Sequence, residues 1–297
     1  MIDYKKYLDP KFVAKLKSID LKAKLVVEGF LEGLHKSPYK GSSVEFSDYR
    51  PYIPGDDPKR IDWKVYARKD RFYIKEYQEE TNLRAYILLD CSGSMGYSSF
   101  EITKFEYASI LSASLSFLLI KQKDSVGLGL FDRRIKKYIP PATSMHHLRS
   151  LLQIMDRVSP QGKTGVSSAL HALAETIKKR GLVILISDLL DIPTDILSAL
   201  RHIKHRKHEV IVFHILDPLE LEFSFRGSLE MVDIETGKKV IVEAEKIRRD
   251  YIKGIKDFVK KIKAGCAEHE IDYNLIRTDM SLENALMRYL EKRRRMG

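Results

Sequence analysis

Several features that would narrow the class of protein are scarce or missing in this chain of 297 residues. It contains two cysteines, Cys91 and Cys266, which are too few for a disulfide framework or a zinc cluster. No apolar signal segment follows Met1. This absence and the scarcity of cysteine together predict a protein of the reducing cytoplasm. Low-complexity stretches and internal repeats are also missing. Hydrophobic residues make up 44% and charged residues 31% of the chain, which is the composition of a globular protein with a full core.

Long apolar runs are missing as well. The longest extends from Tyr107 to Ile120, between Lys104 and Lys121, and it contains four serines. This run is too short to cross a bilayer. We therefore expect it to form a buried core helix, and we expect no transmembrane segment.

Acidic residues are too few to balance the basic ones, and the formal net charge is +11. Basic residues cluster in residues 201–208 and 292–295. Such clusters can bind nucleic acid, anionic lipid or an acidic protein surface. No aromatic residues that could stack on bases are interleaved with them. We therefore interpret the clusters as a solvated helix end and a frayed C-terminus, and nucleic-acid binding is a less favoured alternative.

The sequence changes character at about residue 81. Before that point, residues 10–34 have the apolar spacing of two helices, residues 54–58 have the chemistry of a turn, and residues 71–77 alternate as in a strand. We expect residues 1–81 to form an N-terminal α+β extension and residues 82–297 to form the main domain.

In the main domain, apolar strands alternate with helices. Ala85–Asp90 and Leu182–Asp188 are continuous apolar runs that end in a carboxylate, which is typical of buried parallel strands. This alternation predicts an α/β fold with a doubly wound, mostly parallel sheet in the strand order 3-2-1-4-5-6. The other expected strands are 125–131, 135–139, 209–216 and 271–276, with a hairpin of 227–235 and 239–242. The expected helices are 104–121, 145–155, 167–179, 194–203, 243–267 and 281–293.

Polar side chains follow the two strands that flank the reversal of this strand order. In open α/β sheets, ligands bind beyond the carboxyl ends of the strands at that reversal, so Asp90 and Asp188 should face one crevice. Ser92 and Ser94 follow Asp90 at every second position, which points them in the same direction. The loop before the next helix can add the hydroxyl of Thr164.

Two carboxylates and three hydroxyls form a set of hard oxygen donors without histidine or cysteine. Such a set suits Mg²⁺, with Mn²⁺ or Ca²⁺ as substitutes. Because few charged ligands would touch the ion, one position would stay open and electrophilic. A carboxylate from a partner protein would fill this position. The alternative is that Ser92 or Ser94 only caps the helix that follows.

The residues of this site, Asp90-Cys91-Ser92-Gly93-Ser94 with Thr164 and Asp188, resemble the DxSxS…T…D pattern of von Willebrand factor A domains. The resemblance implies a metal-ion-dependent adhesion site. It also implies that Ser92, Ser94 and Thr164 touch the ion in at least one state, while Asp90 and Asp188 act largely through water.

Three further segments, 49–64, 75–77 and 216–220, resemble the signature of the bacterial and archaeal family called domain of unknown function 58. Members of this type are typically encoded beside MoxR-type AAA+ ATPases. The resemblance therefore implies an adaptor or co-chaperone role for such an ATPase or its client. The upstream segment is rich in arginine, aspartate and aromatic residues, and it suits either a recognition surface or a clamp packed on the main domain.

The sequence contains no complete catalytic motif. Gly162-Lys163-Thr164 resembles the end of a P-loop, but the first glycine of that motif would fall at position 157, which is Arg157. Cys91 suits a small core residue better than a reactive thiol. A metal-dependent hydrolase remains an alternative, but no general base is evident in the sequence. We therefore expect a metal-dependent protein-binding module and not an enzyme.

Overall fold

The computed structural model describes residues 8–36, 49–51, 73–75, 83–232 and 237–296. The described residues up to Gly33 belong to the same compact unit as those from Leu83 onward, and Leu34–Asn82 form a separate unit. In the separate unit, strands β1 (Tyr49–Pro51) and β2 (Tyr73–Lys75) pair antiparallel, and β2 lies inside the strand expected at 71–77. The turn expected at 54–58 lies outside the described residues. The boundary expected at residue 81 stays a prediction.

A six-stranded sheet forms the centre of the main unit. Its order is β10-β7-β6-β3-β4-β5, and all pairs are parallel except that of β4 with the edge strand β5. This is the expected order, with the reversal between β3 and β6, so the α/β fold class is confirmed. The strands are β3 (Arg84–Asp90), β4 (Ser125–Phe131), β5 (Ile135–Ala142), β6 (Leu182–Ser187), β7 (Glu209–Leu216) and β10 (Asp272–Arg277).

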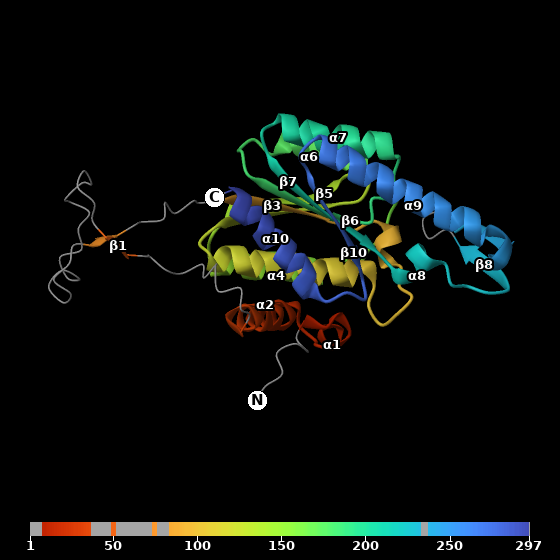
Figure 1. Ribbon diagram of the computed structural model, residues 1–297, viewed down its shortest axis with the longest axis horizontal. Coiled ribbons are helices and arrows are strands. Elements are labelled where there is room, and N and C mark those ends of the chain that lie inside the picture. Colours follow the sequence, from red (N-terminus) through yellow and green to blue (C-terminus); the bar gives the residue numbers. More distant parts are fainter. Residues whose placement is uncertain (1–7, 37–48, 52–72, 76–82, 233–236, 297) are drawn as a thin grey trace. The chain divides into compact units, whose positions relative to one another are not determined.

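Helices cover both faces of the sheet. Helices α4 and α10 lie on one face, and α6, α7 and α9 lie on the other (Figure 1). A separate two-stranded ribbon of β8 (Ser228–Val232) and β9 (Lys239–Glu243) precedes α9. The helices are α1 (Pro10–Ala14), α2 (Ile19–Lys36), the 3₁₀ helix η3 (Gly93–Gly96), α4 (Lys104–Lys121), α5 (Met145–Asp156), α6 (Val166–Thr176), α7 (Pro193–His205), α8 (Pro218–Glu222), α9 (Ala244–Glu268) and α10 (Leu282–Met296).

The N-terminal helices pack on the main domain. Lys22 of α2 donates to Glu106 of α4 at 2.6 Å, and the Ser281 hydroxyl donates to the Leu8 carbonyl at 3.2 Å. Both expected N-terminal helices are present, and they belong to the same compact unit as the sheet.

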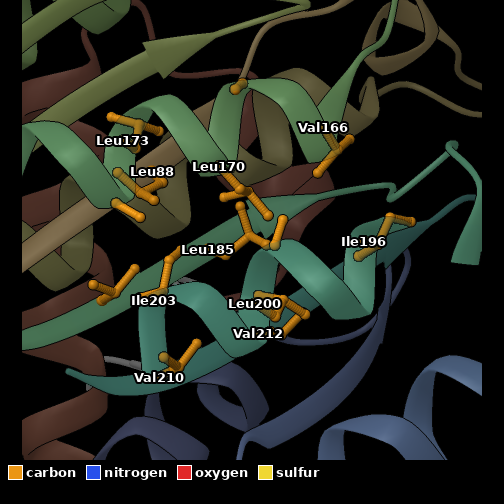
Figure 2. Packing of buried hydrophobic residues seen from close by; sticks show 14 of the residues in the cluster. Leu88, Val166, Leu170, Leu173, Leu185, Ile196, Leu200, Ile203, Val210 and Val212 are labelled. Atoms are coloured by element: carbon orange, nitrogen blue, oxygen red, sulfur yellow. The ribbon is translucent and has the colours of Figure 1, made fainter. Parts of the chain in front are cut away.

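The core between the sheet and helices α6 and α7 is purely apolar. Leu170 of α6 and Leu200 of α7 meet Leu185 of β6 and Val212 of β7, and all four side chains are inaccessible to solvent (Figure 2). Burying one such side chain contributes about 1.5–3 kcal/mol. This core holds β6 and β7 in place, and β6 leads at its carboxyl end into Asp188 of the candidate site.

Helix α6 and strand β5 end three residues away from their expected ends. Helix α6 ends at Thr176, because the chain becomes extended at Ile177 and buries that side chain. Strand β5 continues to Ala142 through two prolines, which an edge strand tolerates because one side of its backbone needs no partner.

The basic run at the C-terminus is not a frayed helix end, and that expectation is wrong for two of its residues. Lys292 pairs with Glu209 at 2.9 Å and with Asp272 at 2.8 Å, and Arg293 pairs with the buried Asp124. These ion pairs fix α10 to the sheet. No helix in the described part of the chain is long and apolar enough to cross a membrane.

Candidate functional site

Two loops are joined beyond the carboxyl end of β3. The amide of Gly93 donates to the Gly162 carbonyl at 2.9 Å, and the amide of Gln161 donates to the Cys91 carbonyl at 3.0 Å. Gly162 has a φ of +97°, and a β-carbon there would lie 2.6 Å from a carboxylate oxygen of Asp132. Glycine is therefore required where the two loops meet.

The hydroxyls of the three candidate ligands converge at this junction. Ser92 Oγ lies 3.1 Å from Ser94 Oγ, which lies 3.2 Å from Thr164 Oγ1. Ser92 stands at the N-terminal cap of η3, but its side chain makes no capping hydrogen bond. Thr103 caps α4 by accepting from the Glu106 amide. The alternative in which Ser92 or Ser94 caps the following helix is therefore wrong.

Asp90 lies under these hydroxyls with no exposed surface. One carboxylate oxygen accepts from the Ser92 amide at 2.9 Å, and the other accepts from the Ser187 hydroxyl at 2.6 Å. Burial, together with the nearby charge of Asp188, raises the pKa of Asp90 to about 7. The carboxylate is thus held in a fixed orientation, but its negative charge is not compensated by any of these contacts.

Asp188, also fully buried, is bound by a buried lysine. Lys104 Nζ lies 2.8 Å from Asp188 Oδ2 and 2.6 Å from Glu220 Oε1. Burial alone would lower the pKa of Lys104, but the charges of the two carboxylates outweigh it and hold the pKa above its ordinary value. One positive charge is therefore shared between two carboxylates.

Glu220 reaches Lys104 from the short helix α8, which is fixed at its start. Asp217 accepts from the Leu219 amide at 2.9 Å, and Glu220 accepts from the Asp217 amide at 2.8 Å, which is a reciprocal capping box. The Ser99 amide also donates to Asp217 at 2.9 Å, and its hydroxyl donates to the same carboxylate. The loop after η3 is therefore tied to α8.

Comparison with known proteins identifies the family. Residues 48–260 match the family described as "Protein of unknown function DUF58". The chain belongs to this family. Its relatives include protein Rv1480 of Mycobacterium tuberculosis, which is 29% identical over 233 residues covering 77% of this chain and 73% of the relative. Protein MAV169 of Mycobacterium avium is 26% identical over 163 residues, which cover 53% of this chain and 94% of the relative.

Solved structures with a similar fold include BatB from Bacteroides thetaiotaomicron, with a TM-score of 0.48 and 15% identity over 71% of this chain and 98% of BatB. The SpRpn10 VWA domain has a TM-score of 0.42 and 13% identity over 70% of this chain and 94% of that domain. The strand order and the joined loops of the DUF58 chain itself position its candidate site.

The chemistry of the donor set fits a hard divalent cation. The hydroxyl oxygens of Ser92, Ser94 and Thr164 face one another at the junction, and oxygen is the donor type that Mg²⁺ prefers. Among the described residues, no three histidine, cysteine, aspartate or glutamate side chains gather as a metal cluster. Any ion at this junction of the DUF58 chain would therefore be held largely by neutral hydroxyls.

The sequence interpretation missed four residues that support the site of this DUF58 chain, namely Lys104, Ser187, His214 and Glu220. A signal existed for Lys104, because a cation in the first turn of an apolar helix opposes the helix dipole and needs a carboxylate partner. His214 contacts the Asp188 carbonyl at 2.9 Å, and burial lowers its pKa to about 4, so it is neutral at pH 7.

Other polar side chains near the sheet take no part in the contacts of the site. Cys91 is fully buried, its thiol donates to the Phe131 carbonyl at 3.1 Å, and burial raises its pKa to about 12. The interpretation of Cys91 as a core residue is confirmed. His147 contacts the Val126 carbonyl at 2.7 Å, and His171 contacts His202 at 3.0 Å.

Proposed function

We propose that this DUF58 chain is a protein-interaction module that binds Mg²⁺ through Ser92, Ser94 and Thr164. The observation that carries the proposal is the convergence of three hydroxyls from two separate loops above a buried, uncompensated carboxylate. Mn²⁺ and Ca²⁺ are the expected substitutes. In this proposal the site serves recognition and not catalysis.

Asp90 and Asp188 would supply negative charge without filling every position around the ion. Ser187 and the Ser92 amide orient Asp90 and leave its charge in place. Lys104 already neutralises part of the charge of Asp188. Because an ion here would keep positive charge, it would favour an anionic ligand at the remaining position, and when bound it would supply a Lewis-acidic site for a carboxylate of a partner.

We propose a MoxR-type AAA+ ATPase or its client as that partner. The basis is the resemblance of residues 49–64, 75–77 and 216–220 to the family signature. In this role the chain would act as an adaptor or co-chaperone, and the metal would make binding conditional on a carboxylate at one position of the partner.

The test is capture of a purified MoxR-type ATPase from the same organism by the immobilised chain, in Mg²⁺ and in EDTA. We expect capture only with Mg²⁺. Asp90→Ala and Thr164→Ala should each weaken capture at least about tenfold, because each removes part of the ion's environment.

The matched control is Ser168→Ala, which removes a nearby exposed hydroxyl that donates to the carbonyls of Arg133 and Gly165. This variant should capture the ATPase as the wild type does. Undiminished capture by Asp90→Ala and Thr164→Ala in EDTA would refute a metal-dependent contact.

A further inference from the structure

One face of the β8–β9 ribbon consists only of apolar side chains. The antiparallel register pairs Leu229 with Val242 and Met231 with Val240. Side chains alternate along a strand, so these four share one face, which we call the apolar ribbon face. Met231 is 40% and Val240 57% exposed, while Leu229 and Val242 are half-buried. The face is therefore uncovered toward the strand ends farther from α9.

The opposite face of the ribbon is mixed in character. Glu230 and Lys239 form an ion pair there at 2.5 Å, and the apolar side chains of Val232 and Ile241 lie on the same face at 49% and 74% exposure. The two faces differ in charge, because charged side chains lie on the opposite face and none lies among the four residues of the apolar ribbon face. An exposed apolar surface without charges is typical of a surface that another protein covers.

The ribbon is attached to the folded domain by several hydrogen bonds. The Gly227 carbonyl accepts from the Ala244 amide at 2.9 Å, and the Gly227 amide donates to Glu245 at 2.9 Å. The Arg248 guanidinium donates to the Phe223 carbonyl at 3.1 Å. Figure 1 shows β8 near the N-terminal end of α9, beyond α8. A ligand on the apolar ribbon face would thus meet a preformed surface.

Helix α9, which follows the ribbon, carries an excess of positive charge. It has 25 residues, of which eight are basic and four are acidic. Only Ala244, Ile262, Gly265 and Cys266 are buried, so most of its basic side chains face solvent. The ribbon that carries the apolar face is therefore continuous with a positively charged helix, whose charge is complementary to an acidic ligand.

We propose that the apolar ribbon face, together with α9, binds an amphipathic helix of a partner protein whose polar side is acidic. The apolar stripe of such a helix would cover Met231 and Val240, and its flanking carboxylates would meet the lysines and arginines of α9. This contact needs no metal ion, so it is a second binding surface in addition to the candidate metal site.

The experiment uses the full chain and a synthetic helical peptide of leucine and glutamate, with leucine at helical spacing, in EDTA. Binding is measured by fluorescence anisotropy. Met231→Glu and Val240→Glu should each weaken binding about tenfold or more, because each places a charge at the apolar contact. Ile241→Glu is the matched control, since it adds the same charge to the opposite face of the same ribbon, and it should leave binding within about twofold.

Control peptides, vesicles and sedimentation distinguish an acidic amphipathic helix from other ligands. A peptide of the same composition without helical periodicity, and one with lysine in place of glutamate, should both bind at least about tenfold more weakly. Equal binding of the three peptides, or equal loss in Ile241→Glu and Val240→Glu, would overturn the proposal. Binding to phosphatidylserine vesicles or dimerisation in sedimentation, if lost in Val240→Glu while the peptide does not bind, would also overturn it. Because EDTA is present throughout, none of these outcomes depends on the metal proposal.

Discussion

The surroundings of Asp90 in the candidate site change its charge state. It is fully buried, its two oxygens accept hydrogen bonds from the Ser92 amide and the Ser187 hydroxyl, and no cation pairs with it in these contacts. Burial and the charge of Asp188 raise its pKa to about 7. A proton and the proposed metal ion would therefore compete for this carboxylate.

If Mg²⁺ binds as proposed, its effect on stability should depend on pH. Between about pH 4, the ordinary pKa of aspartate, and about pH 7, the folded metal-free chain retains a proton that the unfolded chain has lost. Asp90 therefore costs stability as the pH rises through this window, and Mg²⁺ should offset that cost. The rise in melting temperature caused by Mg²⁺ should be larger at about pH 8 than at about pH 5.5. In Asp90→Asn the rise should be small at both values, and equal rises at both values in the wild type would contradict the assignment.

Lys104 is the residue that makes the second carboxylate tolerable in the interior. Its replacement by methionine leaves Asp188 and Glu220 buried without a counter-charge. We expect Lys104→Met to lower the free energy of unfolding by about 3–5 kcal/mol, measured by urea denaturation.

Lys239→Met is the control for Lys104→Met, because Lys239 pairs with Glu230 while 63% and 50% of their side chains are exposed. It should change stability by less than about 1 kcal/mol. Similar losses in both variants would mean that the buried pair is no more important than a surface one.

At the scale of single residues, only part of the candidate site could be predicted from the sequence. Ser92 and Ser94 were predictable because period-two spacing after a buried strand fixes their direction. Thr164 was predictable because its loop precedes the helix that leads to β6. Lys104 and Ser187 were not assigned a role, because their partners are distant in sequence and their own local patterns describe a helix and a strand.

At the scale of elements, the shortest helices position the site and are the hardest to predict. η3 has four residues and α8 has five, so neither shows a hydrophobic period. Both depend on local hydrogen bonds, and those of α8 come from Asp217, which also binds Ser99. Their geometry is therefore determined by contacts between loops that meet only after the sheet has formed.

Loss of the Asp217 cap should loosen α8 and the loop that it holds. We expect Asp217→Ala to lower the free energy of unfolding by about 2 kcal/mol, because a cap and the partner of Ser99 are lost together. The matched control is Asp9→Ala, since Asp9 also caps a five-residue helix before a proline but is exposed and binds only the Lys11 amide among the contacts described for its side chain. Urea denaturation of both variants measures the difference. If Asp217→Ala lowers the free energy of unfolding no more than Asp9→Ala does, α8 does not support the site.

At the scale of the whole molecule, the sheet was the most predictable part. Strands β3 and β6 are buried on both faces, so their sequences are continuous apolar runs, and their alternation with helices fixed the order that the structure confirms. The position of the N-terminal helices was not predictable, because their contact with α4 depends on side chains more than 80 residues apart. The basic C-terminus was misinterpreted, because its partners Asp124 and Glu209 lie far from it in sequence.

The central claim is that Ser92, Ser94 and Thr164 of one chain hold a single divalent ion. Its most direct test is isothermal titration calorimetry of Mg²⁺ into the metal-free wild type and into Ser92→Ala, at a pH above the pKa of Asp90. Our account predicts one binding site per chain in the wild type and at least about tenfold weaker binding in Ser92→Ala, with Ser168→Ala unchanged. Absence of binding to the wild type, or equal binding by Ser92→Ala, would contradict it.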